Sequence, residues 1–336
     1  MYFLVSVKIM REYVDESGQF LSKCAADTLS NAAESLKSGA LVAFPTETVY
    51  GLGADASNEK AVARIYQVKG RPQDHPLILH IASMNDITYW AEEVSDYAIA
   101  LARSFWPGPM TLIFNRSAAA KDFVTGGQDT VGLRVPDHSL ALGLLQECKK
   151  IGVHAIAAPS ANRFGHVSPT TAVAVQEEIG TYLSAEDLIL DGGAAQVGLE
   201  STIIDCTGDA PRILRPGAIT KAMIEEATGI KVSESSESAI RVSGSLEKHY
   251  APNAQILLDV QASEGQGFIA PADVATPTGA VRLASPQTTD EYARALYSAL
   301  RDGDAQGLKT IAVIQPSGDG LAIAIRDRLM RASKGR

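Results

Sequence analysis

The stretch LVAFPTETVYGLG, Leu41 to Gly53, decides how the first half of the chain is interpreted. It begins as a buried strand, because four apolar residues run up to Phe44 and Pro45 then removes a donor from the strand ladder. The next three residues, TET, place hydroxyls and a carboxylate where a core residue is expected. Two glycines near the end permit a turn or a close ligand approach. The stretch is therefore similar to a nucleotide-binding loop that lacks its lysine.

The composition is that of an ordinary globular protein. The chain has 336 residues, 46% of them apolar and 21% charged, which is enough for two domains with sizeable cores. A formal net charge of −9 argues against a protein that coats nucleic acid, although it does not exclude a local basic cleft. The three cysteines lie far apart, so we expect neither a disulfide framework nor a zinc site, and we expect a cytoplasmic location.

The N-terminal segment MYFLVSVKIM shows no targeting signal. It is too short to span a bilayer and has no small-residue cleavage pattern, so we expect no membrane segment. Met10 opens a second candidate start, MREYVDES, and we hypothesise that the residues before it are a misassigned extension. Detection of Met1 or Tyr2 at the N-terminus of the native protein by mass spectrometry would refute this hypothesis.

Strand-like and helix-like segments alternate along most of the chain, which predicts an α/β architecture. Ser57 is the expected N-cap of a helix that ends at Gly70, and Ser168 is the expected N-cap of a helix over 168–180. A polar stretch from about 225 to 245 predicts a linker. Beyond it, the segments AQILLDV, VRLAS and TIAVIQP and two amphipathic helices predict a small parallel-sheet domain without a convergent polar motif.

Five polar clusters lie at predicted strand ends, where open α/β sheets bind ligands. The first is the opening stretch, for which a capped turn with a solvated Glu47 is the structural alternative. The second is Lys69-Gly70-Arg71, interpreted as an extended segment whose cations point to one side and whose glycine lets an anion approach. A solvated helix C-terminus is the alternative for this cluster. His80, in the strand LILHI, is expected to reach a covered surface, either as a ligand-binding group or as a satisfied core histidine.

The other three clusters belong to later strands. WPGPMT is a rigid turn that delivers Thr111 into a strand and is by itself structural. Arg134 lies within the strand VGLRVP, and a buried guanidinium needs a carboxylate or phosphate partner. The fifth cluster joins Pro159–Asn162 and Ser201–Thr202 with a second strand arginine, Arg215. Its hydroxyls and amides either cap the following helices or bind an anionic ligand, and the nearby arginine favours the ligand.

Together these motifs resemble one family, the YrdC/Sua5 family of L-threonylcarbamoyladenylate synthases. Seven motifs are similar and follow in the same order: PTETVYGLG, KGRP with PLILHI, WPGPMT, VGLRVP, PSANRFG, LESTIID and LRPG. The tract SLEKHYAP, Ser245 to Pro252, and the chain beyond it resemble the long, Sua5-type members. The resemblance implies a YrdC-like twisted open mixed sheet with helices in residues 1–224 (core about 28–220), a linker at 225–252 that covers the active site, and a small Rossmann-like α/β domain at 253–336.

The resemblance also implies a reaction. L-threonine, bicarbonate and ATP, with Mg²⁺, give L-threonylcarbamoyl-AMP and pyrophosphate, so the enzyme is a nucleotidyltransferase. Downstream tRNA threonylcarbamoyl-transfer machinery then uses the product for the t6A modification of adenosine 37 in tRNA. Such a site has to bring three reactants together and neutralise developing charge with cations and oriented donors. We expect no protein side chains as metal ligands.

The resemblance assigns a role to each candidate residue. Lys69 and Arg71 are assigned to catalysis, as cations on the ATP phosphates and the carbamate. The nucleotide is assigned to these two residues together with Ser160, Asn162, Ser201 and Arg215. Threonine is assigned to Thr46, Tyr50, His80, Thr111 and Arg134, with Thr46 and His80 as candidates for its hydroxyl. His249 and Tyr250 are lid candidates, the alternative being a tether that packs on the first domain.

Two other functions compete with this one. The first domain could be an RNA-binding module without synthase activity, with weak tRNA binding. Between Leu41 and Arg134, however, eight Lys and Arg stand against ten Asp and Glu, so the linear sequence has no strongly basic tract. A carbamoyl-phosphate-using enzyme ranks last, because the expected zinc-finger and acylphosphatase segments are missing.

Overall fold

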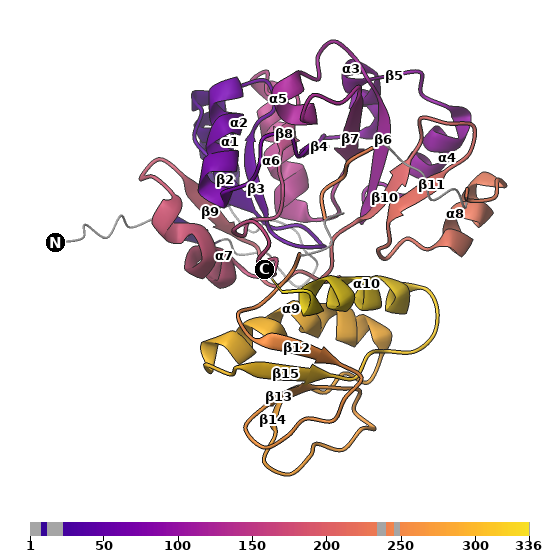
Figure 1. Ribbon diagram of the computed structural model, residues 1–336. Helices are drawn as coiled ribbons and strands as arrows, with labels where there is room; N and C mark the ends of the chain where they lie inside the picture. The colour runs from indigo at the N-terminus through magenta and orange to yellow at the C-terminus, as the bar shows by residue number, and fades with distance from the viewer. Residues whose placement is uncertain (1–7, 12–22, 234–239, 245–248, 336) are drawn as a thin grey trace.

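The computed structural model describes residues 8–11, 23–233, 240–244 and 249–335. Two α/β domains follow one another along the chain (Figure 1). The first is built on a large mixed sheet, and the second on a small parallel sheet whose two helices lie on the side that faces the first domain. Both the α/β class and the second parallel-sheet domain were predicted from the sequence, and both predictions are confirmed.

The first domain contains strands β1 to β11 and helices α1 to α8. Its strands are Lys8–Arg11, Val42–Phe44, Gly51–Asp55, Ile78–His80, Ala91–Glu92, Met110–Arg116, Thr130–Arg134, Ile156–Ala157, Leu188–Asp191, Thr202–Asp205 and Arg212–Arg215. Its α-helices are Lys23–Ser38, Glu59–Lys69, Ile87–Trp90, Asp96–Phe105, Asp122–Thr125, Ser139–Lys150, Ala172–Ile179 and Lys221–Thr228. Two 3₁₀ turns, Met84–Asp86 and Gly180–Tyr182, complete it.

The large sheet has the strand order β1-β9-β2-β3-β8-β4-β7-β6-β10-β11, with β5 paired to β6. The sheet is mixed, because it contains both parallel and antiparallel strand pairs. The parallel pair β4 and β7 places His80 directly beside Arg134. These two predicted site residues are 54 positions apart in the chain. They are therefore neighbours at the carboxyl ends of two adjacent strands.

The opening stretch spans β2, a turn and β3. The two strands pair antiparallel, with Phe44 opposite Gly51. A Cβ on Gly53 would lie 2.6 Å from Ile156 of the neighbouring strand region, so this glycine is required by close packing and not by a turn. The loop is therefore the connection of a buried hairpin at the middle of the sheet.

Some predicted local features differ from the structure. Asn58, and not Ser57, caps α2, because its side chain accepts the N–H of Ala61. The helix predicted over 168–180 begins later, at Ala172, with Thr171 as its N-cap. Ser168 is not a cap, because its hydroxyl donates to the distant Glu200. Helix α8 also extends to Thr228 and so occupies the first residues of the predicted linker.

The second domain contains β12 to β15 and two helices. Its elements are β12 Gln255–Leu258, β13 Gly267–Ile269, β14 Val281–Ala284, α9 Thr289–Ala305, β15 Thr310–Val313 and α10 Leu321–Ser333. All strand pairs are parallel, in the order β12-β15-β13-β14. The short strand β13 was not recognised in the sequence, because its three residues carry no periodic pattern. Among the described residues, no helix is long and apolar enough to cross a membrane.

Candidate active site

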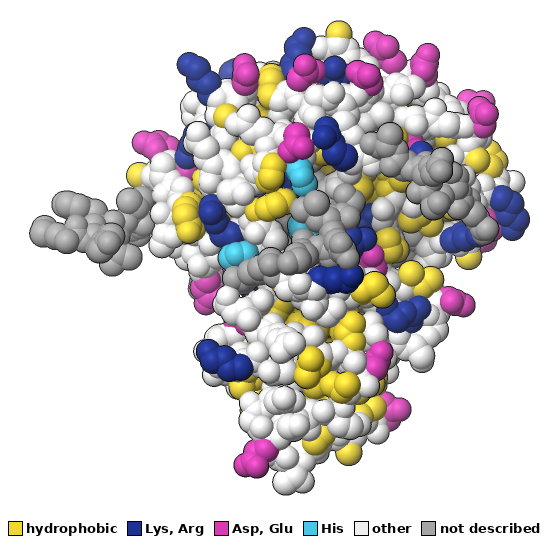
Figure 2. All heavy atoms as spheres, viewed as in Figure 1, with side chains coloured by type: hydrophobic (Ala, Val, Ile, Leu, Met, Phe, Trp, Pro, Cys, Tyr) yellow, Lys and Arg dark blue, Asp and Glu magenta, His cyan; other side chains and the backbone are white. Residues whose placement is uncertain are grey.

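A cleft lies where the first domain meets the linker. On the face shown in Figure 2, Lys, Arg and His side chains gather where the two domains meet. The lining residues come from the opening stretch, the end of α2, β4, β7, the loop after β8, the loop before β10, β11 and the linker. They are Thr46, Thr48, Val49, Gly51, Lys69, Arg71, Ile78, His80, Arg134, Ala158, Pro159, Ser160, Glu200, Ser201, Arg215, Ser243, Gly244, His249 and Tyr250.

Three cations of the cleft have no carboxylate within ion-pair distance among the residues that the structure describes: Lys69, Arg71 and Arg215. The ammonium of Lys69 donates to the carbonyls of Ser160 and Asn162, at 2.6 and 2.5 Å, which leaves one of its three donors. The guanidinium of Arg71 donates to Pro76 O and to the hydroxyl of Ser243. Neutral oxygens orient these cations without cancelling their charge.

Arg215 is held in the same way. Its Nε and one terminal nitrogen donate to the carbonyl of Ser201 at 3.1 and 2.9 Å, and the other terminal nitrogen donates to Ser243 O. The hydroxyl of Ser201 also accepts from this guanidinium. Ser243 of the linker therefore contacts two of the cleft arginines, Arg71 through its hydroxyl and Arg215 through its carbonyl.

Burial and crowding of like charges perturb the titration of these cations. Burial and then the nearby Arg71 hold the pKa of Lys69 well below its usual range. Burial lowers the pKa of Arg71 to about 10 and also lowers the pKa of Arg215. The site therefore disfavours its own positive charge, and a bound anion would relieve that cost.

Two imidazoles in the cleft are neutral at physiological pH. Burial and then Arg134 lower the pKa of His80 to about 3, while burial, with Lys69 and Arg71 nearby, lowers the pKa of His249 to about 3. The Nδ1 atom of each ring has no hydrogen-bond partner within the described part of the chain. A buried polar atom without a partner costs about 1–3 kcal/mol, so a ligand with matching groups would stabilise the site.

The fourth cleft cation, Arg134, does have a carboxylate partner. Glu47 lies 2.7 Å from it, and both side chains are buried. The requirement of a partner for the strand arginine is therefore confirmed, whereas the alternative of a solvated Glu47 is wrong. The turn that carries Glu47 is capped, as expected. The hydroxyl of Thr46 accepts the N–H groups of Thr48 and Val49 and donates to Val49 O.

The structure corrects the interpretation of Lys69-Gly70-Arg71. The segment is not extended: Lys69 ends α2, and Gly70 has φ +62° as the left-handed C-cap. A Cβ on Gly70 would lie 2.7 Å from the guanidinium of Arg163, so this glycine packs against a cation and does not admit an anion. The solvated alternative is also wrong, because Lys69 is only 2% exposed and lines the cleft.

The cleft brings together most of the predicted site residues. Three of them do not line it: Tyr50, Thr111 and Asn162. The hydroxyl of Tyr50 donates to Gly193 O and its ring lies in the core. Thr111 lies behind Ser201 and contacts its hydroxyl at 2.8 Å. Asn162 contributes through its carbonyl, which accepts from Lys69.

Both lid candidates line the cleft. His249 and Tyr250 are buried, and Tyr250 has φ +62°, a left-handed backbone that is rare for an aromatic residue. The ring of Tyr250 stacks on Tyr297 of the second domain, and the N–H of the next residue donates to Gly165 O. Of the tract SLEKHYAP, residues 245–248 lie outside the described residues.

Two polar residues of the cleft, Glu200 and Ser243, lie outside the clusters predicted from the sequence. Glu200 is the only carboxylate in the cleft lining that the structure describes, and it was quoted only as part of LESTIID. An acidic residue next to a predicted buried strand was the available signal. Ser243 carries no sequence signal, because a serine in a polar linker is ordinary.

The fold and the cleft define a two-domain α/β protein with a cation-lined ligand site beneath a linker. Residues 34–217 match the family model Sua5_yciO_yrdC, described as "Telomere recombination". Residues 219–334 match the model Sua5_C, described as "Threonylcarbamoyl-AMP synthase, C-terminal domain". The chain belongs to the Sua5/YciO/YrdC family and carries the C-terminal domain of its Sua5 members.

Individual relatives match almost the whole chain. The threonylcarbamoyl-AMP synthase of Pyrococcus abyssi is 38% identical over 322 residues, covering 90% of this chain and 93% of the relative. That of Bacillus subtilis is 37% identical over 358 residues, covering 98% and 99%. A crystal structure of P. abyssi Sua5 complexed with L-threonine has a TM-score of 0.84 at 35% identity, covering 98% of this chain and 97% of that one.

Proposed function

We propose that this protein is an L-threonylcarbamoyladenylate synthase. It converts L-threonine, bicarbonate and ATP to L-threonylcarbamoyl-AMP and pyrophosphate, for the t6A37 modification of tRNA. The observation that carries the proposal is the convergence of Lys69, Arg71 and Arg215 on one cleft without carboxylate partners in the described structure. Relatives that match the chain from end to end and bear this name support it.

The residues suit the chemistry of the reaction. The amino group of threonine takes up bicarbonate with loss of water, and one oxygen of the resulting carbamate attacks the α-phosphorus of ATP. The bond from the α-phosphorus to the bridging oxygen breaks, and pyrophosphate leaves with that electron pair. Lys69 and Arg71 stabilise charge on the phosphoryl oxygens and the leaving group, which is the largest contribution that a site of this kind makes. Ser160, Ser201 and Arg215 orient the nucleotide.

We propose that threonine binds at a separate end of the cleft, near the paired ends of β4 and β7. Thr46, His80 and Arg134 line this end. The unpartnered Nδ1 of His80 provides a partner for the threonine hydroxyl, which would favour threonine over valine. Arg134 retains its Glu47 partner and presents only part of its guanidinium to the substrate carboxylate.

The described residues provide no built metal site. No group of three or more His, Cys, Asp and Glu side chains is suitably arranged among them. The carboxylate of Glu200, which lines the cleft, already accepts from Ser168, Tyr297 and Arg328. We therefore propose that Mg²⁺ enters as part of the substrate MgATP, held by the phosphates, as is common for this ion.

The downstream partner in this proposal is the machinery that transfers the threonylcarbamoyl group to tRNA. A reducing cytoplasm is the proposed location, in agreement with the burial of the free cysteines Cys148 and Cys206. Weak direct binding of tRNA is a separate proposal, for which the acidic net charge gives no support.

The proposal is tested by incubating the full chain with MgATP, bicarbonate and each of the common amino acids. We expect a threonylcarbamoyl-adenylate mass and pyrophosphate release that both need threonine and bicarbonate together. Serine turnover equal to that of threonine would contradict the assigned pocket. Salt-dependent tRNA binding without any ATP turnover would instead support the RNA-binding alternative.

We further propose that His249 and Tyr250 act as a lid that excludes water from the acyl phosphate. Their burial against the cleft and the second domain supports this role. Tyr250→Ala should retain threonine binding but give a lower yield of product, and unchanged synthesis would contradict the lid. Tyr250→Phe is the matched control, because the hydroxyl has no hydrogen-bond partner in the described structure and its loss should be nearly neutral.

A further inference from the structure

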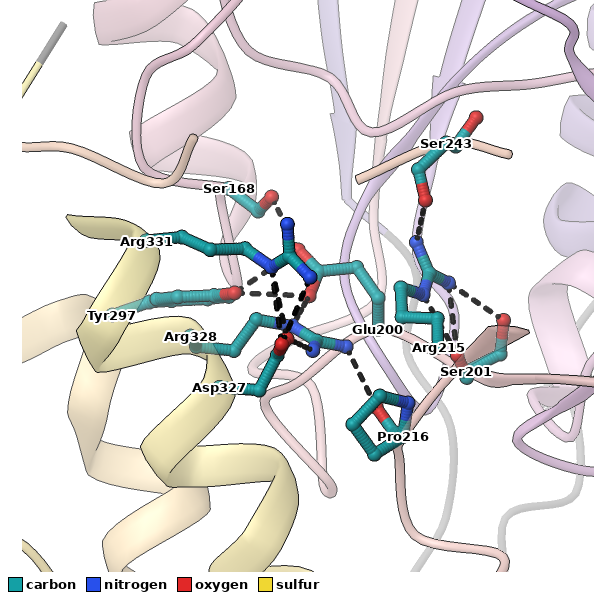
Figure 3. Close-up of polar contacts among 10 residues, drawn as sticks. All are labelled: Ser168, Glu200, Ser201, Arg215, Pro216, Ser243, Tyr297, Asp327, Arg328 and Arg331. Carbon is teal, nitrogen blue, oxygen red and sulfur yellow. Dashed lines mark hydrogen bonds and ion pairs between the residues drawn. The ribbon is translucent and has the colours of Figure 1, made fainter. Parts of the chain in front are cut away.

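A buried arginine of the second domain reaches the wall of the cleft. Arg328 lies on α10 and is 0% exposed. Its Nε donates to Glu200 at 2.9 Å, and one terminal nitrogen donates to the carbonyl of Pro216 at 3.0 Å (Figure 3). Its guanidinium carbon lies 5.2 Å from the ring centroid of Tyr250. One side chain thus contacts three separate segments that border the cleft.

These contacts lie next to the nucleotide side of the cleft. Glu200 directly precedes Ser201, and Pro216 directly follows Arg215. Ser201 and Arg215 are bonded to one another, since the guanidinium donates to both the carbonyl and the hydroxyl of the serine. Arg328 therefore holds the two chain segments that carry this pair in a fixed relation.

A second residue of the same domain supports the arrangement. The hydroxyl of Tyr297, on α9, donates to Glu200 at 2.9 Å, and its ring stacks on Tyr250. Ser168 donates to the other carboxylate oxygen at 2.6 Å. Burial alone would raise the pKa of Glu200, but Arg328, Arg215 and the hydrogen bond from Ser168 lower it to about 2. Glu200 is therefore an anion at neutral pH, and both helices of the second domain donate a hydrogen bond to it.

We propose that Arg328 is a positioning residue for the nucleotide side of the cleft. By binding Glu200 and Pro216 together, it fixes the adjacent Ser201 and Arg215 relative to Lys69 and Arg71. The planar guanidinium suits this role, because it donates to the two acceptors from two different nitrogens held in one plane, whereas the three donors of an ammonium share a single nitrogen. The inference rests on the proposed function, and it gives the second domain a defined part in the reaction.

The test compares Arg328→Gln with the unaltered full chain, by equilibrium binding of MgATP and, separately, of L-threonine. We expect the Kd for MgATP to rise about tenfold or more, because a displacement of the order of 1 Å disturbs an aligned site strongly. The Kd for threonine should stay within about twofold, since Thr46 and Arg134 have their hydrogen bonds and ion pair within the first domain among the described residues. An equal loss for both ligands, or no loss for either, would overturn the proposal.

Three further variants make the result specific. Arg328→Lys keeps the charge and loses the planar fork, so it should not restore MgATP binding; full restoration would show that charge alone acts. Arg294→Gln removes an exposed interdomain hydrogen bond, from its Nε to Gln196 O, and should change neither affinity.

If Arg328→Gln fails to fold, the variant Tyr297→Phe tests the positioning role instead. Removal of its hydroxyl should weaken MgATP binding several-fold without affecting threonine, and unchanged MgATP binding would refute the proposal.

The two proposals fail in different ways. If the unaltered chain binds MgATP and forms the adenylate, and Arg328→Gln does the same equally well, only the positioning role is wrong. If the unaltered chain neither binds MgATP nor releases pyrophosphate, the proposed function itself is wrong.

Discussion

The cleft and the interface between the domains use buried charge in opposite ways. In the cleft, Lys69, Arg71 and Arg215 contact neutral oxygens and have no carboxylate partner in the described structure. At the interface, Arg328 is paired with Glu200, and Arg301 lies 3.1 Å from Glu178. Arg328 and Glu200 are buried like the three cleft cations, and Arg301 and Glu178 are partly buried, but only the interface arginines have carboxylate partners.

The difference indicates what each region binds. A buried cation without a counter-ion is costly unless something else supplies the negative charge, and a phosphate or carbamate would do so in the cleft. The interface has no such need, because each of these two ion pairs joins a carboxylate of the first domain to an arginine of the second. The unpaired cations of the cleft are thus available to bind an anionic ligand, whereas the paired charges of the interface hold the two domains together.

The largest expected effect is the loss of a cleft cation. Lys69→Ala should lower the rate of threonine-dependent pyrophosphate release by about 10²–10³-fold, because a preoriented charge that faces the phosphates is removed. Lys60→Ala, at an exposed position of the same helix, is the matched control and should leave the rate unchanged. Retained activity in Lys69→Ala would mean that the cleft cations do not act on the phosphates.

The next effect concerns the one cleft cation that is paired. Glu47→Ala leaves Arg134 buried without its counter-ion and should lower the free energy of unfolding by about 3–5 kcal/mol, measured by urea denaturation. Asp129→Ala removes an exposed partner of Arg116, 3.6 Å away, and should cost less than about 1 kcal/mol. Equal losses in the two variants would show that burial of the pair is unimportant.

The interface should be sensitive to acid. Burial opposes ionisation of Glu178 and Glu200, but the interdomain arginines and hydrogen bonds lower the pKa of each to about 2. Because the folded-state pKa lies below the unfolded value, this stability is complete above about pH 4.5 and is lost as the pH falls toward 2. Thermal unfolding should follow that loss, and Glu178→Gln should flatten the profile. A wild-type profile that is flat over this range would contradict the ion pairing.

The smallest effect is the uptake of part of a proton when nucleotide binds. Burial and Arg71 lower the pKa of Lys69 in the free protein, and a bound phosphate would raise it again. At alkaline pH the binding of MgATP should therefore take up less than one proton, detected by calorimetry in buffers of different ionisation enthalpy. Lys69→Arg stays charged and should abolish the uptake. No uptake by the unaltered chain would show that Lys69 is fully protonated before binding.

The sequence allowed the two-domain α/β fold and most of the cleft lining to be predicted, since strand ends and turn residues are local signals. His80 and Arg134 were expected at one sheet edge, and β4 and β7 place them side by side. Tyr50 was misplaced because side-chain direction after a turn depends on packing, and its hydroxyl donates to Gly193 O in the interior. The helix end at Gly70 was predicted, but Lys69-Gly70-Arg71 was interpreted as extended, because the sequence does not show that Lys69 still belongs to the helix and that Gly70 is left-handed.

By itself, the opening stretch LVAFPTETVYGLG determined that a strand would end in a polar turn and that the cations of the site had to come from elsewhere in the chain. Only the tertiary structure decided that Glu47 pairs with Arg134, that Lys69 turns inward at a helix end, and that Glu200 is held from the second domain. The physical reason is that hydrogen-bonding type and turn preference are properties of neighbouring residues. The partner of a buried charge, by contrast, is selected by distances across the folded chain.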